Sequence, residues 1–206
     1  RIDAALIMVS PPDAFGYCSL GPTVEWTPAA LETARVVVAQ INPAMPRTGG
    51  LSHLHVSRIH YAIEREAPLP VMAAPEPGAV YRQIAEYAAQ LVSDGDTLQL
   101  GVGPVGTAMR EALRQHRHLG IHSEVIGDGV MELFREGVID NSRKTLLPGK
   151  VVASQALGSR PLYAFLDNNP HFDFRPTDFT NNPLNIARND RMVCLNGALL
   201  SDLGGQ

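Results

Sequence analysis

The feature that most constrains the fold is a regular alternation of helical and extended patterns in the second half of the chain. Apolar residues recur at helical spacing over residues 80–91, and an apolar strand pattern follows at 97–100. A glycine-rich loop, a helix at 105–116, a strand at 120–123 and a helix at 129–136 continue the series. This alternation predicts right-handed crossover connections, so we expect an α/β fold with mostly parallel sheets.

A proline-rich stretch divides the chain, since four of the twelve residues from Ala67 to Gly78 are proline. We therefore predict two open α/β units, the first over residues 1–66 and the second over residues 80–206, joined by a linker at 67–79. The first unit opens directly with an apolar run, Ile2 to Val9, which is typical of a strand buried on both faces. We expect this unit to be incomplete and the chain to be a fragment of a longer polypeptide.

Composition excludes several classes of protein. Hydrophobic residues make up 45% of the 206 residues and charged residues 18%, a balance too apolar for intrinsic disorder. A net charge of -4 without any local Lys or Arg run argues against a nucleic-acid partner. No apolar stretch approaches the roughly 18 residues of a membrane span. Cys18 and Cys194 lie far apart, as expected for reduced thiols in a cytoplasmic protein.

The glycine-rich loop Gly101-Val-Gly-Pro-Val-Gly106 follows a strand and opens a helix, as a dinucleotide-binding fingerprint does. Glycines at these positions let a backbone approach a ligand closely, and a helix N-terminus attracts a phosphate. Coenzyme A carries a pyrophosphate as nicotinamide dinucleotides do, so both ligands fit the pattern. A tight turn without any ligand fits it as well.

Glu124 follows the next strand, where sites of open parallel sheets lie. It could be an ordinary surface carboxylate, a nucleophile, a general base or a ribose ligand. Asn168-Asn169-Pro170 and the stretch from Thr180 to Pro183 place side-chain amides in turns, and one or two of these could donate to a bound carbonyl oxygen. The seven His lack Cys or acidic residues at metal-ligand spacing, so we expect no metal.

A set of segments along nearly the whole chain resembles the acetyl-CoA hydrolase/transferase family, close to its 4-hydroxybutyrate and acetate CoA-transferase members. In chain order the segments are Ser10-Pro-Pro-Asp13, Gly16-Tyr-Cys-Ser-Leu-Gly21, Met45-Pro-Arg-Thr48, Leu98-Gln-Leu-Gly-Val-Gly103, Leu119-Gly-Ile-His-Ser-Glu124, Asp128-Gly129, Lys144-Thr145, Asn169-Pro170, Thr180-Asn-Asn-Pro183 and Ser201-Asp-Leu203.

The resemblance implies CoA transfer between a short-chain acyl-CoA and a small carboxylate such as acetate, with Glu124 as the nucleophile that passes through a glutamyl-CoA thioester. Asn182, or its neighbour Asn181, would donate to the oxyanion. Coenzyme A would be a substrate, and no metal would be needed. Family members commonly form homo-oligomers, so we expect one here. The residues expected to contact coenzyme A are Gly101, Val102, Gly103, Pro104 and Val105.

Three other functions stay open at this point. The same Glu124 could serve an acetyl-CoA hydrolase, in which water replaces the acceptor carboxylate. The glycine pattern could belong to a nicotinamide-dependent oxidoreductase. The chain could also be a non-catalytic CoA-binding or assembly fragment.

Overall fold

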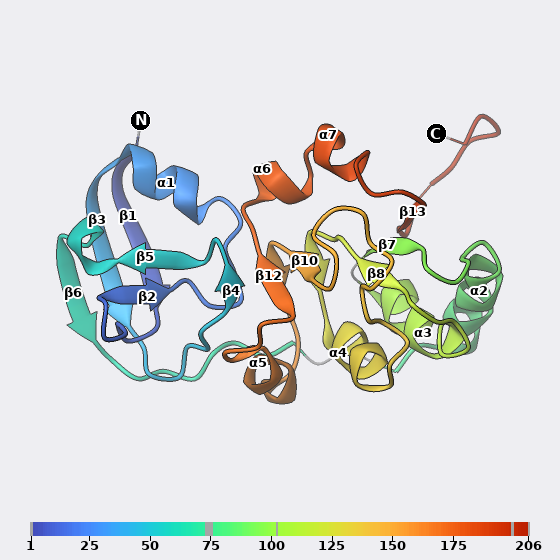
Figure 1. Ribbon diagram of the computed structural model, residues 1–206, viewed down its shortest axis with the longest axis horizontal. Helices are drawn as coiled ribbons and strands as arrows, with labels where there is room; N and C mark the ends of the chain where they lie inside the picture. Colours follow the sequence, from blue (N-terminus) through green and yellow to red (C-terminus); the bar gives the residue numbers. More distant parts are fainter. Residues whose placement is uncertain (1, 73–75, 102, 199, 206) are drawn as a thin grey trace.

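The computed structural model describes residues 2–72, 76–101, 103–198 and 200–205 (Figure 1). Residues 2–66, the described part of the predicted first unit, lie in the left half of that view. The elements of this unit are β1 (Ile2–Val9), β2 (Tyr17–Ser19), α1 (Thr27–Thr33), β3 (Ala34–Ile41), β4 (Gly49–Gly50), β5 (His53–His55), a 3-10 turn (Val56–Arg58) and β6 (Tyr61–Glu64).

The first unit is built on a parallel sheet with β3 at its centre. β1 and β6 flank β3, and the register pairs Val9 with Ile41 in the β1–β3 ladder. Val9, Val37 and Ala39 are buried against β2 and β5, which form a short antiparallel ladder over the sheet. The β-branched run of β3 favours this central strand position. The apolar run at Ile2 to Val9 is a strand, as predicted, but the prediction that both its faces are buried is wrong, since only Ala5 and Val9 are buried and Leu6 is 79% exposed.

The second part of the chain alternates helices and strands (Figure 1). Its elements are α2 (Ala79–Ala89), β7 (Thr97–Leu100), α3 (Pro104–Ala112), β8 (Gly120–Ile121), β9 (Val125–Ile126), α4 (Asp128–Arg135), β10 (Val151–Ala153), β11 (Gln155–Ala156), α5 (Arg160–Leu166), β12 (Phe172–Phe174), α6 (Thr177–Thr180), α7 (Pro183–Ile186) and β13 (Met192–Leu195).

The strands of this part run parallel, which confirms the predicted α/β class. One sheet has the order β13-β7-β8, and a bridge between His122 and Val152 connects it to a second sheet with the order β10-β12-β4. β4 belongs to the first unit, so the two predicted units meet in one continuous set of strands across the centre of the molecule (Figure 1). The division into two units stays a prediction, and strands from both sides of the predicted linker share one hydrogen-bonded sheet.

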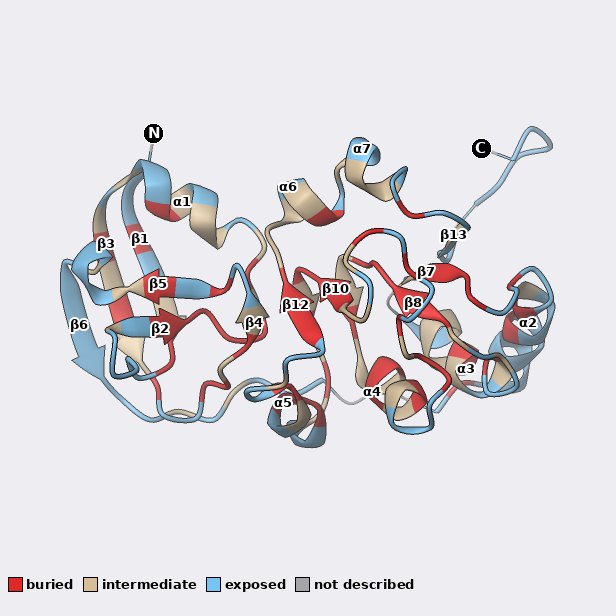
Figure 2. Cartoon of the chain, viewed as in Figure 1, coloured by how far each residue is buried: buried red, intermediate tan, exposed pale blue. Residues whose placement is uncertain are grey.

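A core lies around β8, β10 and β12, which are coloured as buried in Figure 2. Phe172 and Phe174 of β12 are at most 1% exposed and pack with the apolar faces of α4 and α5. α2 forms as its spacing predicts, but its large residues face outward, with Val80 68% and Tyr87 63% exposed. The small Ala85 packs inward instead, and it lets α2 approach α3 closely.

Candidate functional site

The structure places the glycine loop and Glu124 at the same edge of one sheet. β7 and β8 are neighbouring parallel strands, with Leu98 paired to Ile121, so the chain leaves both strands on the same side. The Ser123 hydroxyl lies 3.3 Å from the Leu100 carbonyl oxygen, to which it donates, and thereby ties the two strand ends together. The edge therefore carries both features that the sequence singles out.

The glycine loop needs its glycines for geometry. Gly103 caps α3 with φ of 110°, a backbone conformation that side-chain-bearing residues rarely adopt. A Cβ placed on Gly106 would lie 2.1 Å from the Gly101 carbonyl oxygen, so only glycine permits the close turn from β7 into α3. Pro104 begins the helix with its fixed φ. Val102 lies outside the described residues.

A hollow of about 500 Å³ opens beside this loop. Gly101, Gly103 and Pro104 line it, and so does the stretch from Val125 to Gly127 that follows Glu124. The helices α3 and α4 form its wall through residues such as Arg110 and Leu133. Most of the lining is apolar or glycine backbone, which is the character of a cofactor or substrate cleft.

Glu124 sits in the short connection between β8 and β9, and its backbone is held firmly. Its carbonyl oxygen accepts from the backbone N–H groups of Ser154 and Gln155, both at 2.9 Å, and from the Ser154 hydroxyl at 3.0 Å. The side chain is half-buried, and its Oε2 accepts a hydrogen bond of 2.9 Å from Nδ2 of Asn181. The strand predicted over 120–123 ends at Ile121, and His122 after it pairs with Val152 in an isolated bridge.

The two candidate amides have different partners. Asn181 follows α6 and donates to Glu124, whereas Asn182 caps α7 by accepting from the Leu184 backbone N–H at 2.9 Å. Of the two, the structure therefore brings Asn181 to the carboxylate. Asn169, in the other amide-rich turn, bonds to the backbone of Phe165 and His171, as ordinary turn chemistry explains.

A second carboxylate near Glu124 comes from the first unit and was missed by the sequence analysis. Glu25 is half-buried, has φ of 39°, and accepts from the Thr177 backbone N–H through its carbonyl oxygen at 3.1 Å. Burial raises the pKa of the Glu25 carboxyl, and the nearby negative charge of Glu124 raises it further. No local pattern marks Glu25, because its position depends on pairing between segments 130 or more residues apart.

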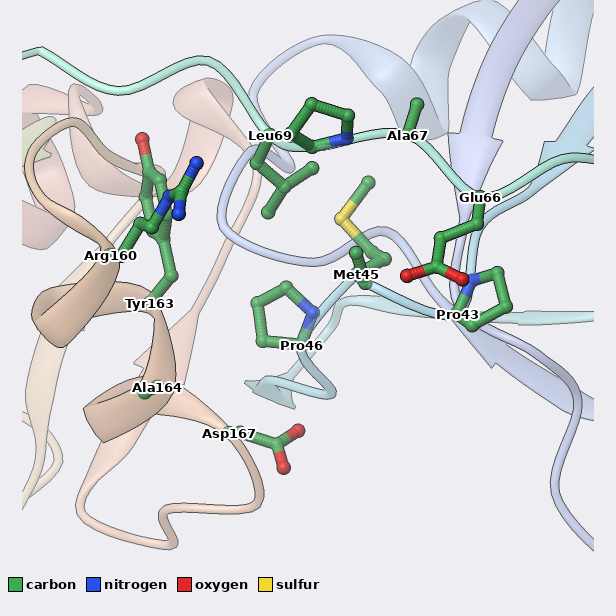
Figure 3. Close-up of a pocket in the computed structure, with 12 residues that line it drawn as sticks. Pro43, Met45, Pro46, Glu66, Ala67, Leu69, Arg160, Tyr163, Ala164 and Asp167 are labelled. Carbon is green, nitrogen blue, oxygen red and sulfur yellow. The ribbon is translucent and has the colours of Figure 1, made fainter.

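A larger hollow of about 810 Å³ lies between the first unit and α5 (Figure 3). Met45 and Pro46 point into it from one side, and Arg160 and Tyr163 of α5 line the other. Its walls come from segments other than those that carry Glu124 and the glycine loop.

Within the described ranges, no three or more His, Cys, Asp or Glu side chains gather as a metal ion would require. Over the same part of the chain, every helix is too short or too polar to cross a bilayer.

Two family models match the two ends of the chain. The model of the acetyl-CoA hydrolase/transferase N-terminal domain matches residues 1–73, and that of the C-terminal domain matches residues 158–206. Among characterised proteins, the chain is 47% identical over 205 residues to a 4-hydroxybutyrate coenzyme A transferase of Clostridium kluyveri, covering all of this chain and 48% of that protein. It is 40% identical to a succinyl-CoA:acetate/propanoyl-CoA:succinate CoA transferase of Fasciola hepatica, covering all of this chain and 43% of that one.

Solved structures agree with these matches. A 4-hydroxybutyrate CoA-transferase from Porphyromonas gingivalis superposes with a TM-score of 0.90 at 44% identity, over 93% of this chain and 49% of that chain. RipA from Yersinia pestis superposes with a TM-score of 0.95 at 36% identity, over 99% of this chain and 48% of that chain. The chain thus spans about half the length of the relatives that it matches.

Proposed function

Because the chain belongs to the acetyl-CoA hydrolase/transferase family, we propose that the full-length protein moves coenzyme A between an acyl-CoA thioester and a small carboxylate. The observation that carries the proposal is a half-buried carboxylate, Glu124, that follows β8 at the sheet edge where the glycine loop follows β7, and that accepts a hydrogen bond from Asn181. Relatives named as CoA transferases for 4-hydroxybutyrate, acetate and succinate support this reaction class. We propose short-chain acyl groups as the substrates, like those in these two names.

In the first step the Glu124 carboxylate attacks the thioester carbonyl carbon of the donor. The C–S bond breaks, the electron pair leaves on sulfur, and the products are an acyl-glutamyl anhydride and CoA thiolate. A thiolate has a low enough basicity, with an ordinary thiol pKa of about 8.5, to leave without a general acid. This residue type therefore suits the chemistry without a metal or a proton donor.

In the second step the CoA thiolate attacks the Glu124 carbonyl carbon of the anhydride. The donor acid leaves as its carboxylate, and a glutamyl-CoA thioester remains. An incoming acceptor carboxylate then reverses both steps, which yields the new acyl-CoA and regenerates Glu124. The cycle is a ping-pong reaction in which one bond to Glu124 breaks for each one that forms.

Each attack creates an oxyanion that needs hydrogen-bond donors. Nδ2 of Asn181 already donates to Oε2 of Glu124 at 2.9 Å, so it can stabilise the negative charge that forms on this oxygen when the Glu124 carbonyl carbon is attacked. Backbone N–H groups of the glycine loop are the second set of donors, and Gly101, Gly103, Pro104 and Val105 frame the coenzyme. Asn182 holds the start of α7 and supports the turn that carries Asn181.

Trapping of the intermediate tests the proposal. Full-length protein incubated with acetyl-CoA and then reduced with borohydride should carry an alcohol in place of the Glu124 carboxyl, visible by peptide mass spectrometry. Glu124→Gln is the matched control and should show neither the label nor acyl exchange. An unmodified Glu124 during turnover would overturn the assigned nucleophile.

A release assay separates transfer from hydrolysis, which the half-exposed Glu124 would also support. Free CoA thiol is measured with acetyl-CoA alone and then with an added carboxylate acceptor. A transferase releases little thiol and forms new acyl-CoA only with the acceptor. Steady thiol release without an acceptor would assign the protein to the hydrolases instead.

A further inference from the structure

We propose that His122 is a positioning residue whose neutral imidazole holds the carbonyl of Thr180 and thereby sets the Asn181 amide against Glu124. The inference rests on the proposed CoA transfer and extends it to a residue that does not touch the substrate. Its basis is a buried hydrogen bond from His122 to the Thr180 carbonyl and a second one from the adjacent Asn181 to the Glu124 carboxylate.

The first link is a buried hydrogen bond. Nε2 of His122 lies 2.9 Å from the Thr180 carbonyl oxygen, and the two residues are 1% and 2% exposed. A carbonyl oxygen can only accept, so Nε2 must carry the proton. Nδ1 is buried and has no hydrogen-bond partner among the described residues, so it holds a lone pair in the neutral ring.

The surroundings keep this ring neutral. Burial lowers the pKa of His122, and the nearby Lys144 lowers it as well, although the hydrogen bond to Thr180 works in the opposite direction. A second proton would place an unpaired N–H and a charge in the core. His122 is therefore a fixed donor of a single hydrogen bond rather than a proton carrier.

The second link runs along the chain from Thr180 to Asn181. Asn181 is the residue after Thr180, and the Thr180 hydroxyl donates to Oδ1 of Asn181 at 3.3 Å. That contact leaves Nδ2 of Asn181 directed at Oε2 of Glu124, 2.9 Å away. The Asn181 amide therefore accepts from Thr180 through its oxygen and donates to Glu124 through its nitrogen.

The His122 side chain contacts this turn both through its hydrogen bond and through its ring. α6 is only four residues long, and its Phe179 ring centroid lies 4.5 Å from the Arg175 guanidinium and 6.3 Å from the centroid of the His122 imidazole. The imidazole of His122 reaches from the end of β8, two residues before Glu124, to the carbonyl at the end of α6. It therefore fixes the distance between the two segments that carry the donor and the nucleophile.

Loss of this hydrogen bond should slow the chemical step more than it weakens binding. A misplacement of about 1 Å in a reacting constellation costs about 10²-fold in rate. For His122→Phe, which keeps a planar ring but lacks the donor, we expect kcat to fall about 10- to 100-fold. KM for the acyl-CoA should stay within about threefold because the glycine loop is untouched.

Two variants make the comparison specific. His122→Gln keeps a donor at the same reach as Nε2 and should recover most of the lost kcat. His116→Phe is the matched control, since Nε2 of His116 also lies 3.1 Å from a backbone carbonyl oxygen, that of Val92, and its Nδ1 is also buried without a partner in the described part of the chain. That variant should keep the wild-type kcat.

Structural readouts separate this proposal from the proposed function. A crystal structure of full-length His122→Phe should show Nδ2 of Asn181 moved out of hydrogen-bond distance of Glu124. If His122→Phe does not fold, nitrogen chemical shifts of His122 in the wild-type protein should still show a protonated Nε2 and a bare Nδ1 at pH 7.

Three results would overturn the positioning role: wild-type kcat in folded His122→Phe, an unmoved Asn181 in its structure, or a proton on Nδ1 in the wild-type protein. By contrast, full turnover by Glu124→Gln would overturn the proposed function while leaving the hydrogen bond from His122 to Thr180 intact. The two failures are therefore distinguishable.

Discussion

Lys144 should make the stability of this protein depend on pH in a window where most proteins show little change. Its side chain is 4% exposed, and Nζ donates to the carbonyl oxygens of Ile121 and Lys150, each at 2.7 Å. Burial lowers the pKa of Lys144 from 10.5 to about 7, while the negative charge of Asp173 opposes that shift. Above pH 7 the buried amine is therefore mostly neutral in the folded protein.

The direction of the effect follows from proton counts. In the unfolded chain Lys144 keeps its ordinary pKa, so between about pH 7 and 10 the unfolded state binds one proton more than the folded state. The free energy of unfolding should thus rise with pH, by roughly 1 kcal/mol per pH unit. Between pH 7.5 and 9 the free energy of unfolding should rise by roughly 2 kcal/mol. Well below pH 7 both states bind the proton, so the contribution of Lys144 to the pH slope should disappear.

Urea unfolding of full-length protein across this pH range provides the assay, with wild type, Lys144→Met and Lys150→Met compared. Lys144→Met removes the titrating amine and should lose the pH slope. Lys150→Met is the matched control and should keep it, because only the backbone carbonyl of Lys150 contacts Nζ of Lys144. Equal slopes for wild type and Lys144→Met would refute a neutral buried amine.

Three further changes test other parts of the structure. Glu25→Gln should raise the free energy of unfolding at pH 7 but not at pH 4. The raised pKa means that ionised Glu25 destabilises the folded state, and protonation removes this effect; urea titrations at both pH values measure it. Gly106→Ala should push its Cβ into the Gly101 carbonyl oxygen and weaken CoA binding about tenfold or more by calorimetry, whereas unchanged affinity would contradict the role of the loop. Arg47→Lys keeps the charge but not the four hydrogen bonds of the guanidinium, so thermal unfolding should show a loss of about 1–3 kcal/mol.

Local patterns carried most of the successful predictions. The α/β class followed from helices and strands separated by glycines, and each of these signals depends on residues close in sequence. The spacing that predicted a helix over 80–91 could not show which face is covered, and the structure buries Ala85 rather than Tyr87. Side-chain orientation toward a partner needs knowledge of that partner, which a single helix pattern lacks.

Contacts between distant segments account for what the sequence did not reveal. Gly49–Gly50 carries no strand signal, yet it pairs with β12 because β12 offers an open edge there. Asn181 and Asn182 look equivalent in sequence, and only the turn between α6 and α7 directs one toward Glu124 and the other toward Leu184. The placement of the glycine loop beside Glu124 was predictable, because neighbouring parallel strands end at a common edge.

The pairing of β4 with β12 has a consequence for recombination between related enzymes. The proline-rich connection looks like a natural crossover point for building chimeras, since it joins two stretches of different pattern. A chimera spliced there would inherit one parent's Gly49–Gly50 edge and the other parent's β12, and would also mix the parents' residues at Glu25 and Glu124. Hybrids should therefore succeed only when the two parents match at the β4–β12 pairing and around Glu25 and Glu124.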